Sequence, residues 1–209
     1  LHGLLSNGRY ESLSGTSVKQ DFVELPSQII EHWAVEPEVL KSYARHIETD
    51  EPMPDDLIAR LKATETFNHG FATTEYLAAC YLDLAWHGSA GAAAGDVEDF
   101  EEQAMQQIEK IAMIDPRYKS SYFQHIFSGE HYSAGYYVYM WAEVLDADGY
   151  EAFRENGLFD AVTAKSFREN ILAKGGTVEP MTLYKRFRGR EPDVEPLLRN
   201  RGLMTGPKD

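Results

Sequence analysis

The stretch that decides how this chain is interpreted is residues 14–28, which read SGTSVKQDFVELPSQ. Apolar residues recur at helical spacing from Leu25 onward, whereas the residues before Phe22 show no clear period. Pro26 is tolerated in the first turn of a helix because its missing N–H would have no intrahelical partner. The positive end of the helix dipole favours an acid such as Glu24 there. From the residues alone, Glu24 is a solvated or cap-like acid rather than a metal ligand.

The same stretch, taken together with residues 1–4 (LHGL), resembles a segment of the thimet oligopeptidase and peptidyl-dipeptidase Dcp family of metallopeptidases. In that family a helix carries His-Glu-x-x-His and continues as Ala-Leu-His-Gly-Leu. The resemblance implies that the chain starts just after the two zinc histidines and the catalytic glutamate. It also implies that Glu24 is the third zinc ligand. Residues that the chemistry of a zinc site does not require, such as Phe22, Pro26 and Gln28, match as well. The resemblance therefore favours a metal ligand over a capping acid at Glu24.

Composition limits the class of protein. The chain has 209 residues, of which 43% are hydrophobic and 26% charged, as in a soluble globular domain. Its net charge of -14 argues against a nucleic-acid partner, which requires clustered Lys and Arg. No window is apolar enough to span a bilayer, so no membrane partner is expected. The single cysteine, Cys80, lies in an apolar helical run and is expected to be a buried, inert thiol. One cysteine excludes an intrachain disulfide and agrees with a cytoplasmic location.

The pattern predicts a mostly α fold, a multi-helix fragment with a small extended or hairpin segment near residues 9–23. The resemblance identifies it as part of a zincin-like catalytic domain, with residues 1–209 forming one unit. Residues 1–8 are expected to end the incoming helix. The segment 66–87 is apolar on most sides and is expected in the core. Residues 88–95 read as a flexible connector. Further helices are expected at 25–34, 37–47, 54–61, 96–110 (with Lys110 near its end), 120–127, 134–145, 149–156, 160–172, 180–187 and 194–199.

Aromatic residues gather between positions 118 and 141. Tyr132, Tyr136 and Tyr139 recur at spacings that place their hydroxyls on one face of a helix start. A tyrosine-rich core stripe is the simpler interpretation, but every buried hydroxyl needs a partner, which favours a cleft wall. Relatives in the family carry a His, a glycine-rich loop and a tyrosine run opposite the zinc. The resemblance therefore implies that His125, Tyr132, Tyr136 and Tyr139 face the substrate. Residues 128–131 (SGEH) contain fewer glycines than that loop in many relatives.

Several other polar residues are candidates for a supporting or structural role. Asp21 and Glu31 are candidates to orient the metal ligand, with a purely structural Glu31 left open. Glu130 and His131 are expected to be an exposed loop pair rather than a second metal site. Arg190 is expected to tie a helix end to a neighbouring carboxylate. Three histidines without a partner at ligand spacing are expected on the surface or in the core: His46, His69 and His87.

The resemblance implies zinc-dependent hydrolysis of peptide bonds in short peptides, with one Zn²⁺ per full-length protein. Because these residues hold no His-x-x-x-His pair, the fragment alone is expected to be inactive and to bind zinc weakly or not at all. Its partners would be short peptide substrates and the rest of the peptidase chain upstream. The run around residues 125–139 looks closest to the bacterial Dcp-like branch of the family, and this resemblance favours release of C-terminal dipeptides. The alternatives are an oligoendopeptidase of the same family and a catalytically dead helical peptide-binding module.

Overall fold

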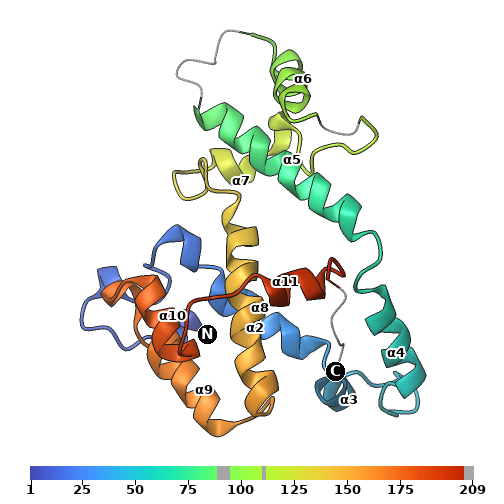
Figure 1. The fold of residues 1–209 in the computed structure, drawn as a ribbon, viewed down its shortest axis with the longest axis vertical. Helices are drawn as coiled ribbons and strands as arrows, with labels where there is room; N and C mark the ends of the chain where they lie inside the picture. Colours follow the sequence, from blue (N-terminus) through green and yellow to red (C-terminus); the bar gives the residue numbers. More distant parts are fainter. Residues whose placement is uncertain (89–94, 110–111, 205–209) are drawn as a thin grey trace. The chain divides into compact units, whose positions relative to one another are not determined.

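The computed structural model describes residues 1–88, 95–109 and 112–204, and it is built from helices and turns (Figure 1). Within these residues the only β pairing is an isolated bridge between Arg45 and Pro52. The predicted mostly α class is confirmed. The chain forms two compact units: Leu1–Phe67 together with the chain from Trp141 onward, and Asn68–Met140.

The first unit is a bundle of mostly short helices around α8 (Val138–Asn156), which begins at the border between the units. Its other α-helices are α1 (His2–Leu5), α2 (Leu25–Ala34), α3 (Pro37–Tyr43), α4 (Asp55–Thr64), α9 (Ala161–Phe167), α10 (Pro180–Arg188) and α11 (Glu195–Asn200). Its shorter turns are the 3-10 helices η1 (Glu11–Leu13), η2 (Gln20–Phe22) and η5 (Gly175–Thr177), and the π-helical η4 (Arg168–Leu172).

The core of the first unit is where α2 meets α8, α9, η4 and α10. Leu25 and Ile29 of α2 are fully buried in the same cluster as Tyr150 of α8 and Leu183 of α10. Burial of large side chains of this kind stabilises the fold by about 1.5–3 kcal/mol each. The start of α2, next to Glu24, is therefore fixed by packing.

The second unit holds α5 (His69–Gly88), α6 (Val97–Gln107), η3 (Ser120–Tyr122) and α7 (Gln124–Phe127), with α6 packed on α5 (Figure 1). The Asp96 side chain caps α6 by accepting hydrogen bonds from the backbone N–H groups of Glu98 and Asp99. Buried residues of α5, including Ala79 and Leu82, pack with the Phe123 side chain. This core supports the loop that follows α7.

Three predictions of local structure were wrong. Residues 9–23 contain the turns η1 and η2 rather than a hairpin. Helix α3 ends at Tyr43 instead of reaching position 47, and a turn closed by the Arg45–Pro52 bridge follows. The expected helices 134–145 and 149–156 are one helix, α8, which starts at Val138 and continues through Gly149.

Helix α5 was expected to be buried on most sides, and only one face of it is. Ala79 and Leu82 are 0% exposed, whereas Phe71 is 49% and Tyr81 48% exposed. The connector residues 89–94 and the predicted helix end at Lys110 lie outside the described residues. No helix in the described parts of the chain is both long and apolar enough to cross a membrane.

Candidate functional site

Glu24 lies between two anchored segments of the first unit. It follows η2 and directly precedes α2, and its neighbours Phe22 and Leu25 are buried. The Glu24 side chain makes no capping hydrogen bond to α2, although it occupies the N-cap position. The Ser27 hydroxyl donates to the Glu24 backbone carbonyl at 2.9 Å and lies 3.4 Å from a Glu24 carboxylate oxygen. The structure therefore does not support the capping role that Glu24 has on sequence grounds alone.

The two residues predicted to support Glu24 differ in exposure. Asp21 is half-buried in η2, whereas Glu31 is exposed on α2. The residue after Glu31, His32, has a partner elsewhere. Its Nε2 lies 2.7 Å from a carboxylate oxygen of Asp146, and its ring stacks on Tyr150 with 4.5 Å between centroids. Burial raises the pKa of Asp146. His32 and Asp146 thus form a structural pair within the bundle.

A zinc site would be incomplete on the described residues. They contain no group of three or more His, Cys, Asp or Glu side chains that could hold a metal ion. A carboxylate oxygen such as that of Glu24 is an ordinary zinc ligand, but a catalytic zinc takes three protein ligands and an open position. The donor chemistry of Glu24 fits one ligand of such a site, and the other ligands would have to come from elsewhere.

The second unit brings the four predicted aromatic site residues into contact. His125 lies in α7, Tyr132 and Tyr136 lie in the turn that follows, and Tyr139 lies in the first turn of α8. The Tyr139 hydroxyl is 2.9 Å from Nε2 of His125. The Tyr132 ring is 4.4 Å from the His125 ring and stacks on Tyr139 at 5.7 Å, with 3° between the planes. We call His125, Tyr132 and Tyr139 the aromatic cluster.

Tyr136 differs from the aromatic cluster because its side chain lies in the core. It is 4% exposed, and burial raises its pKa. The Tyr76 hydroxyl donates to the Tyr136 backbone carbonyl at 2.6 Å, which holds the backbone before α8. The spacing argument for tyrosines on one helix face was wrong in detail, since the helix starts only at Val138 and the tyrosines converge through a turn.

Sequence reasoning missed Asp83, which holds this turn in place. Asp83 lies on α5 and is fully buried. Its carboxylate accepts hydrogen bonds from the backbone N–H groups of Ala134 at 2.9 Å and Tyr136 at 2.8 Å, and contacts Nδ1 of His87 at 2.7 Å. Ala134 has a φ of 54°, which is rare for residues other than Gly, Asn and Asp. An Asp inside the apolar run of residues 81–85 was the available sequence signal, because buried carboxylates need partners.

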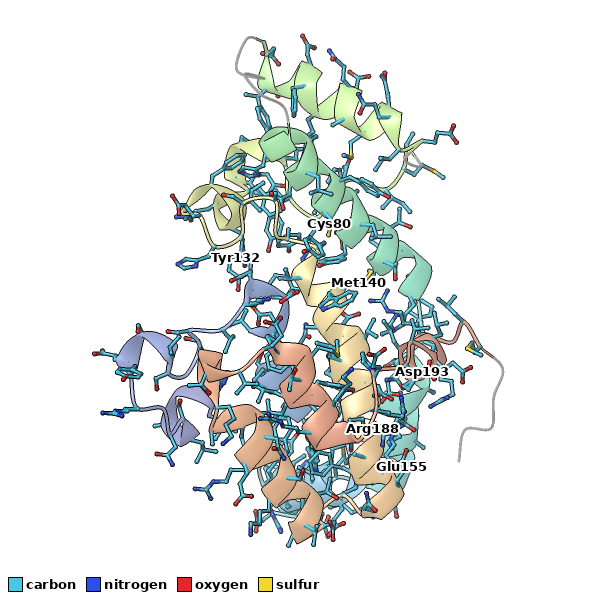
Figure 2. All side chains as sticks on the ribbon, turned by 60° about the vertical axis from the view of Figure 1, so that its left-hand side comes forward. Cys80, Tyr132, Met140, Glu155, Arg188 and Asp193 are labelled. Atoms are coloured by element: carbon cyan, nitrogen blue, oxygen red, sulfur yellow. The ribbon has the colours of Figure 1, made fainter. Side chains whose placement is uncertain are left out.

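Most of the remaining candidates lie where they were expected, but His87 has an unexpected partner. Glu130 and His131 are exposed, and Cys80 is buried (Figure 2 labels its position), with burial raising its thiol pKa to about 11. Arg190 pairs with the fully buried Asp148, as predicted for a helix-end tie. His87 has Asp83 as its partner, four residues earlier on α5.

The described residues thus form a helical protein with a carboxylate metal-ligand candidate in the first unit and the aromatic cluster in the second. Residues 1–203 match the model of Peptidase family M3, so the chain belongs to that family of peptidases.

Relatives with assigned names support this membership. The chain is 46% identical to a dipeptidyl carboxypeptidase of Salmonella typhimurium and 44% identical to one of Escherichia coli, each over 205 residues. It is 39% identical over 207 residues to oligopeptidase A of Haemophilus influenzae. These alignments cover 97–98% of this chain and 30% of each relative. The chain thus spans about a third of the length of the relatives it matches.

Proposed function

We propose that the full-length protein is a zinc-dependent peptidase that acts on short peptides, with Glu24 as one of its three protein ligands to zinc. Membership of Peptidase family M3 supports peptidase chemistry. The single observation that carries the role of Glu24 is the position of this residue in the first unit. Glu24 lies directly before α2, between the buried residues Phe22 and Leu25. The two other ligands and the general base are assigned to a His-Glu-x-x-His helix preceding Leu1.

The chain's own residues would position the peptide and stabilise charge. A bound zinc ion supplies Lewis acidity that activates water and polarises the scissile carbonyl. Tyr139 would donate a hydrogen bond to a developing oxyanion, and His125, whose Nε2 lies 2.9 Å from the Tyr139 hydroxyl, would set the direction of that hydroxyl. Tyr132 stacks on Tyr139 and limits the rotation of its ring. The core position of Tyr136 supports a role in shaping the wall rather than in donating to substrate.

Within the family, release of C-terminal dipeptides is the favoured mode. The two relatives with 46% and 44% identity are named dipeptidyl carboxypeptidases, whereas the oligopeptidase A relative has 39% identity. Internal cleavage of oligopeptides is the second candidate. A peptide-binding module without activity is the third, and it requires the upstream His-Glu-x-x-His to be absent. Residues 1–209 alone should neither cleave peptides nor retain zinc.

The test uses the full-length protein, a Glu24→Ala variant and a Glu38→Ala control, in which an exposed acid of α3 is removed. Zinc content is measured by atomic absorption, and peptides with free or amidated C-termini are digested and their products identified by mass. Dipeptides leaving only from free C-termini, with Glu24→Ala depleted of zinc as purified and inactive, would support the proposal. Internal cuts that ignore the terminus would assign the oligopeptidase mode. A Glu24→Ala protein that keeps its zinc would reject Glu24 as a ligand.

A further inference from the structure

We propose that Gly175 and Gly176 are a positioning element for Glu24, which holds the backbone leading to this residue against the C-terminal part of the first unit. The inference rests on the proposed function, because the glycines would act through the metal ligand.

Gly175 and Gly176 cross the backbone of the segment before η2 at contact distance. A methyl group added to Gly175 would lie less than 3.0 Å from the carbonyl oxygen of Leu13, and one added to Gly176 would lie equally close to that of Ser17. Side-chain β-carbons ordinarily keep 3.4–4 Å from such atoms. Gly175 also has a φ of +50°, which residues with side chains rarely adopt. Only glycine fits both positions, and we call this contact the glycine crossing.

The turn that meets the glycine crossing is fixed on its other side as well. The backbone N–H of Ser17 donates to the carbonyl of Ser14 at 3.0 Å, which closes the turn around Gly15. Gly15 has a φ of +57°, and a methyl group there would be 3.2 Å from Cα of Gly3 in α1. The Ser6 hydroxyl oxygen accepts the N–H of Gly15 at 2.8 Å. The turn is therefore held between α1 and the glycine crossing. In the proposed enzyme, α1 continues the helix that carries the zinc histidines.

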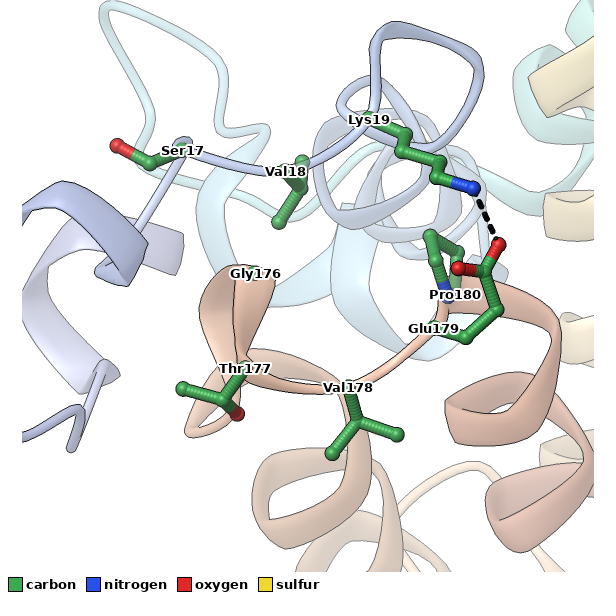
Figure 3. Close-up of a pocket in the computed structure, with 8 residues that line it drawn as sticks. All are labelled: Ser17, Val18, Lys19, Gly176, Thr177, Val178, Glu179 and Pro180. Carbon is green, nitrogen blue, oxygen red and sulfur yellow. Dashed lines mark hydrogen bonds and ion pairs between the residues drawn. The ribbon is translucent and has the colours of Figure 1, made fainter.

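The chain between this turn and Glu24 is short and anchored. The Lys19 amine donates a hydrogen bond to the Glu179 carboxylate at 2.6 Å. Beside this pair lies a hollow of about 380 Å³, which is lined by residues 17–19 and 176–180 and is shown in Figure 3. The N–H of Phe22 donates to the carbonyl of Lys19 at 3.0 Å, and the Phe22 side chain is buried. A displacement of the backbone at Ser17 would therefore be passed along η2 to Glu24.

The size of the displacement decides the effect. Relieving contacts this far below 3.0 Å to an ordinary 3.4 Å requires the two backbones to separate by roughly an ångström. Groups that bind a metal productively must be held within about 0.5 Å of their place. Disturbing the residues that orient a metal ligand typically lowers metal affinity about 10- to 100-fold. We expect that loss for Gly176→Ala.

The experiment measures zinc affinity of the full-length protein by competition with a chelator, together with thermal unfolding of the zinc-free form. Gly176→Ala is compared with Gly95→Ala, an identical methyl addition at an exposed glycine with nothing within 4 Å. Both changes are made in the natural and the Glu24→Ala backgrounds. Gly176→Ala should weaken zinc binding 10- to 100-fold in the natural background. In the Glu24→Ala background it should cause no further loss of zinc affinity, because Gly176 would act only through Glu24. Gly95→Ala should leave the zinc affinity unchanged in both backgrounds.

Gly15→Ala is the milder second variant, because its added methyl group would be 3.2 Å from its neighbour. Should Gly176→Ala not fold, Gly15→Ala carries the test and should weaken zinc binding several-fold in the natural background only. Equal losses in both backgrounds, or no loss for either glycine variant, would overturn the inference while the role of Glu24 stands. A Glu24→Ala protein with unchanged zinc affinity would instead overturn the proposed function, and the positioning role with it.

Discussion

The buried carboxylate of Asp83 accepts a hydrogen bond at 2.8 Å from the backbone N–H of Tyr136, a residue 53 positions later in the chain. The same carboxylate binds the N–H of Ala134. Two backbone donors that would otherwise be unpaired in the core are thereby satisfied, and the start of α8 is fixed relative to α5. The orientation of the aromatic cluster depends on this contact, because Tyr139 follows Tyr136 by less than one helical turn.

Replacing Asp83 by asparagine should disturb this arrangement. An amide offers one acceptor oxygen where the carboxylate offers two, so one buried N–H loses its partner at a cost of about 1–3 kcal/mol. Asp83→Asn should lower the free energy of unfolding by that amount and reduce kcat/KM. Denaturant unfolding and peptide hydrolysis measure the two effects. Asp99→Asn, the same change at an exposed position of α6, should stay within about 0.5 kcal/mol of the unmodified protein. Equal stability of the two variants would contradict the role assigned to Asp83.

Removing the Tyr139 hydroxyl tests the aromatic cluster directly. Tyr139→Phe keeps the ring that stacks on Tyr132 but removes the group 2.9 Å from His125. If this hydroxyl stabilises the oxyanion, kcat should fall about 10²- to 10³-fold with little change in KM. Steady-state kinetics on a dipeptide-releasing substrate provide the measurement. Tyr137→Phe removes a hydroxyl from a neighbouring residue that is 46% exposed, and it should leave kcat unchanged. A similar kcat for both variants would rule out Tyr139 as the donor.

Gly149 lies inside α8 for a packing reason. A methyl group there would be 3.1 Å from Cδ1 of Ile29, which is fully buried and cannot move aside. The overpacking should outweigh the gain in helix propensity, so Gly149→Ala should lower the free energy of unfolding by about 1 kcal/mol. Gly70→Ala on α5 meets nothing within 4 Å and should raise it by up to about 1 kcal/mol. Chemical denaturation of both variants compares them. A stabilising Gly149→Ala would show that the core around Ile29 is loose.

The ion pair between Arg188 and Glu155, which Figure 2 labels, should make stability depend on pH. Arg188 donates to the Glu155 carboxylate and lowers its pKa below the usual 4.5. A depressed folded-state pKa contributes stability that is present above the unfolded-state value and is lost as the pH falls through the folded-state value. Because Glu155 is mostly exposed, Glu155→Gln should cost under about 1 kcal/mol at pH 7.

Thermal unfolding between pH 7 and pH 4 measures this dependence. The difference in melting temperature between Glu155→Gln and the unmodified protein should shrink below pH 4.5. The control is Glu169→Gln, whose carboxylate lies 3.9 Å from the exposed Lys165 amine and should matter less. A difference that is constant with pH would show that Glu155 contributes through packing rather than charge.

The sequence predicted helices best where a local constraint marks their start. Pro26, Pro37 and Pro180 each lie in a first helical turn, because proline fixes φ and needs no donor there. The Asp96 and Asp160 caps were equally readable, since each side chain binds backbone N–H groups two or three residues ahead.

Prediction failed where distant residues decide the structure. The sequence predicts a helix break before Gly149, but Ile29 and Phe187 pack against this glycine and the helix continues. The aromatic cluster was found from spacing and resemblance, whereas Asp83 was missed because its partners Ala134 and Tyr136 come some fifty residues later. Glycines of the crossing were likewise invisible, since a close approach between Ser17 and Gly176 leaves no local pattern.

The order of the two units along the chain has a consequence for synthesis. Leu25 and Ile29 find most of their buried partners among later residues such as Leu145 and Leu183, and the whole unit Asn68–Met140 is translated in between. At about 5–20 residues per second, ribosomes need several seconds to make that insertion. During that interval most residues that bury the apolar face of α2 have not yet been synthesised. The nascent chain therefore exposes an early hydrophobic segment until the last helices emerge.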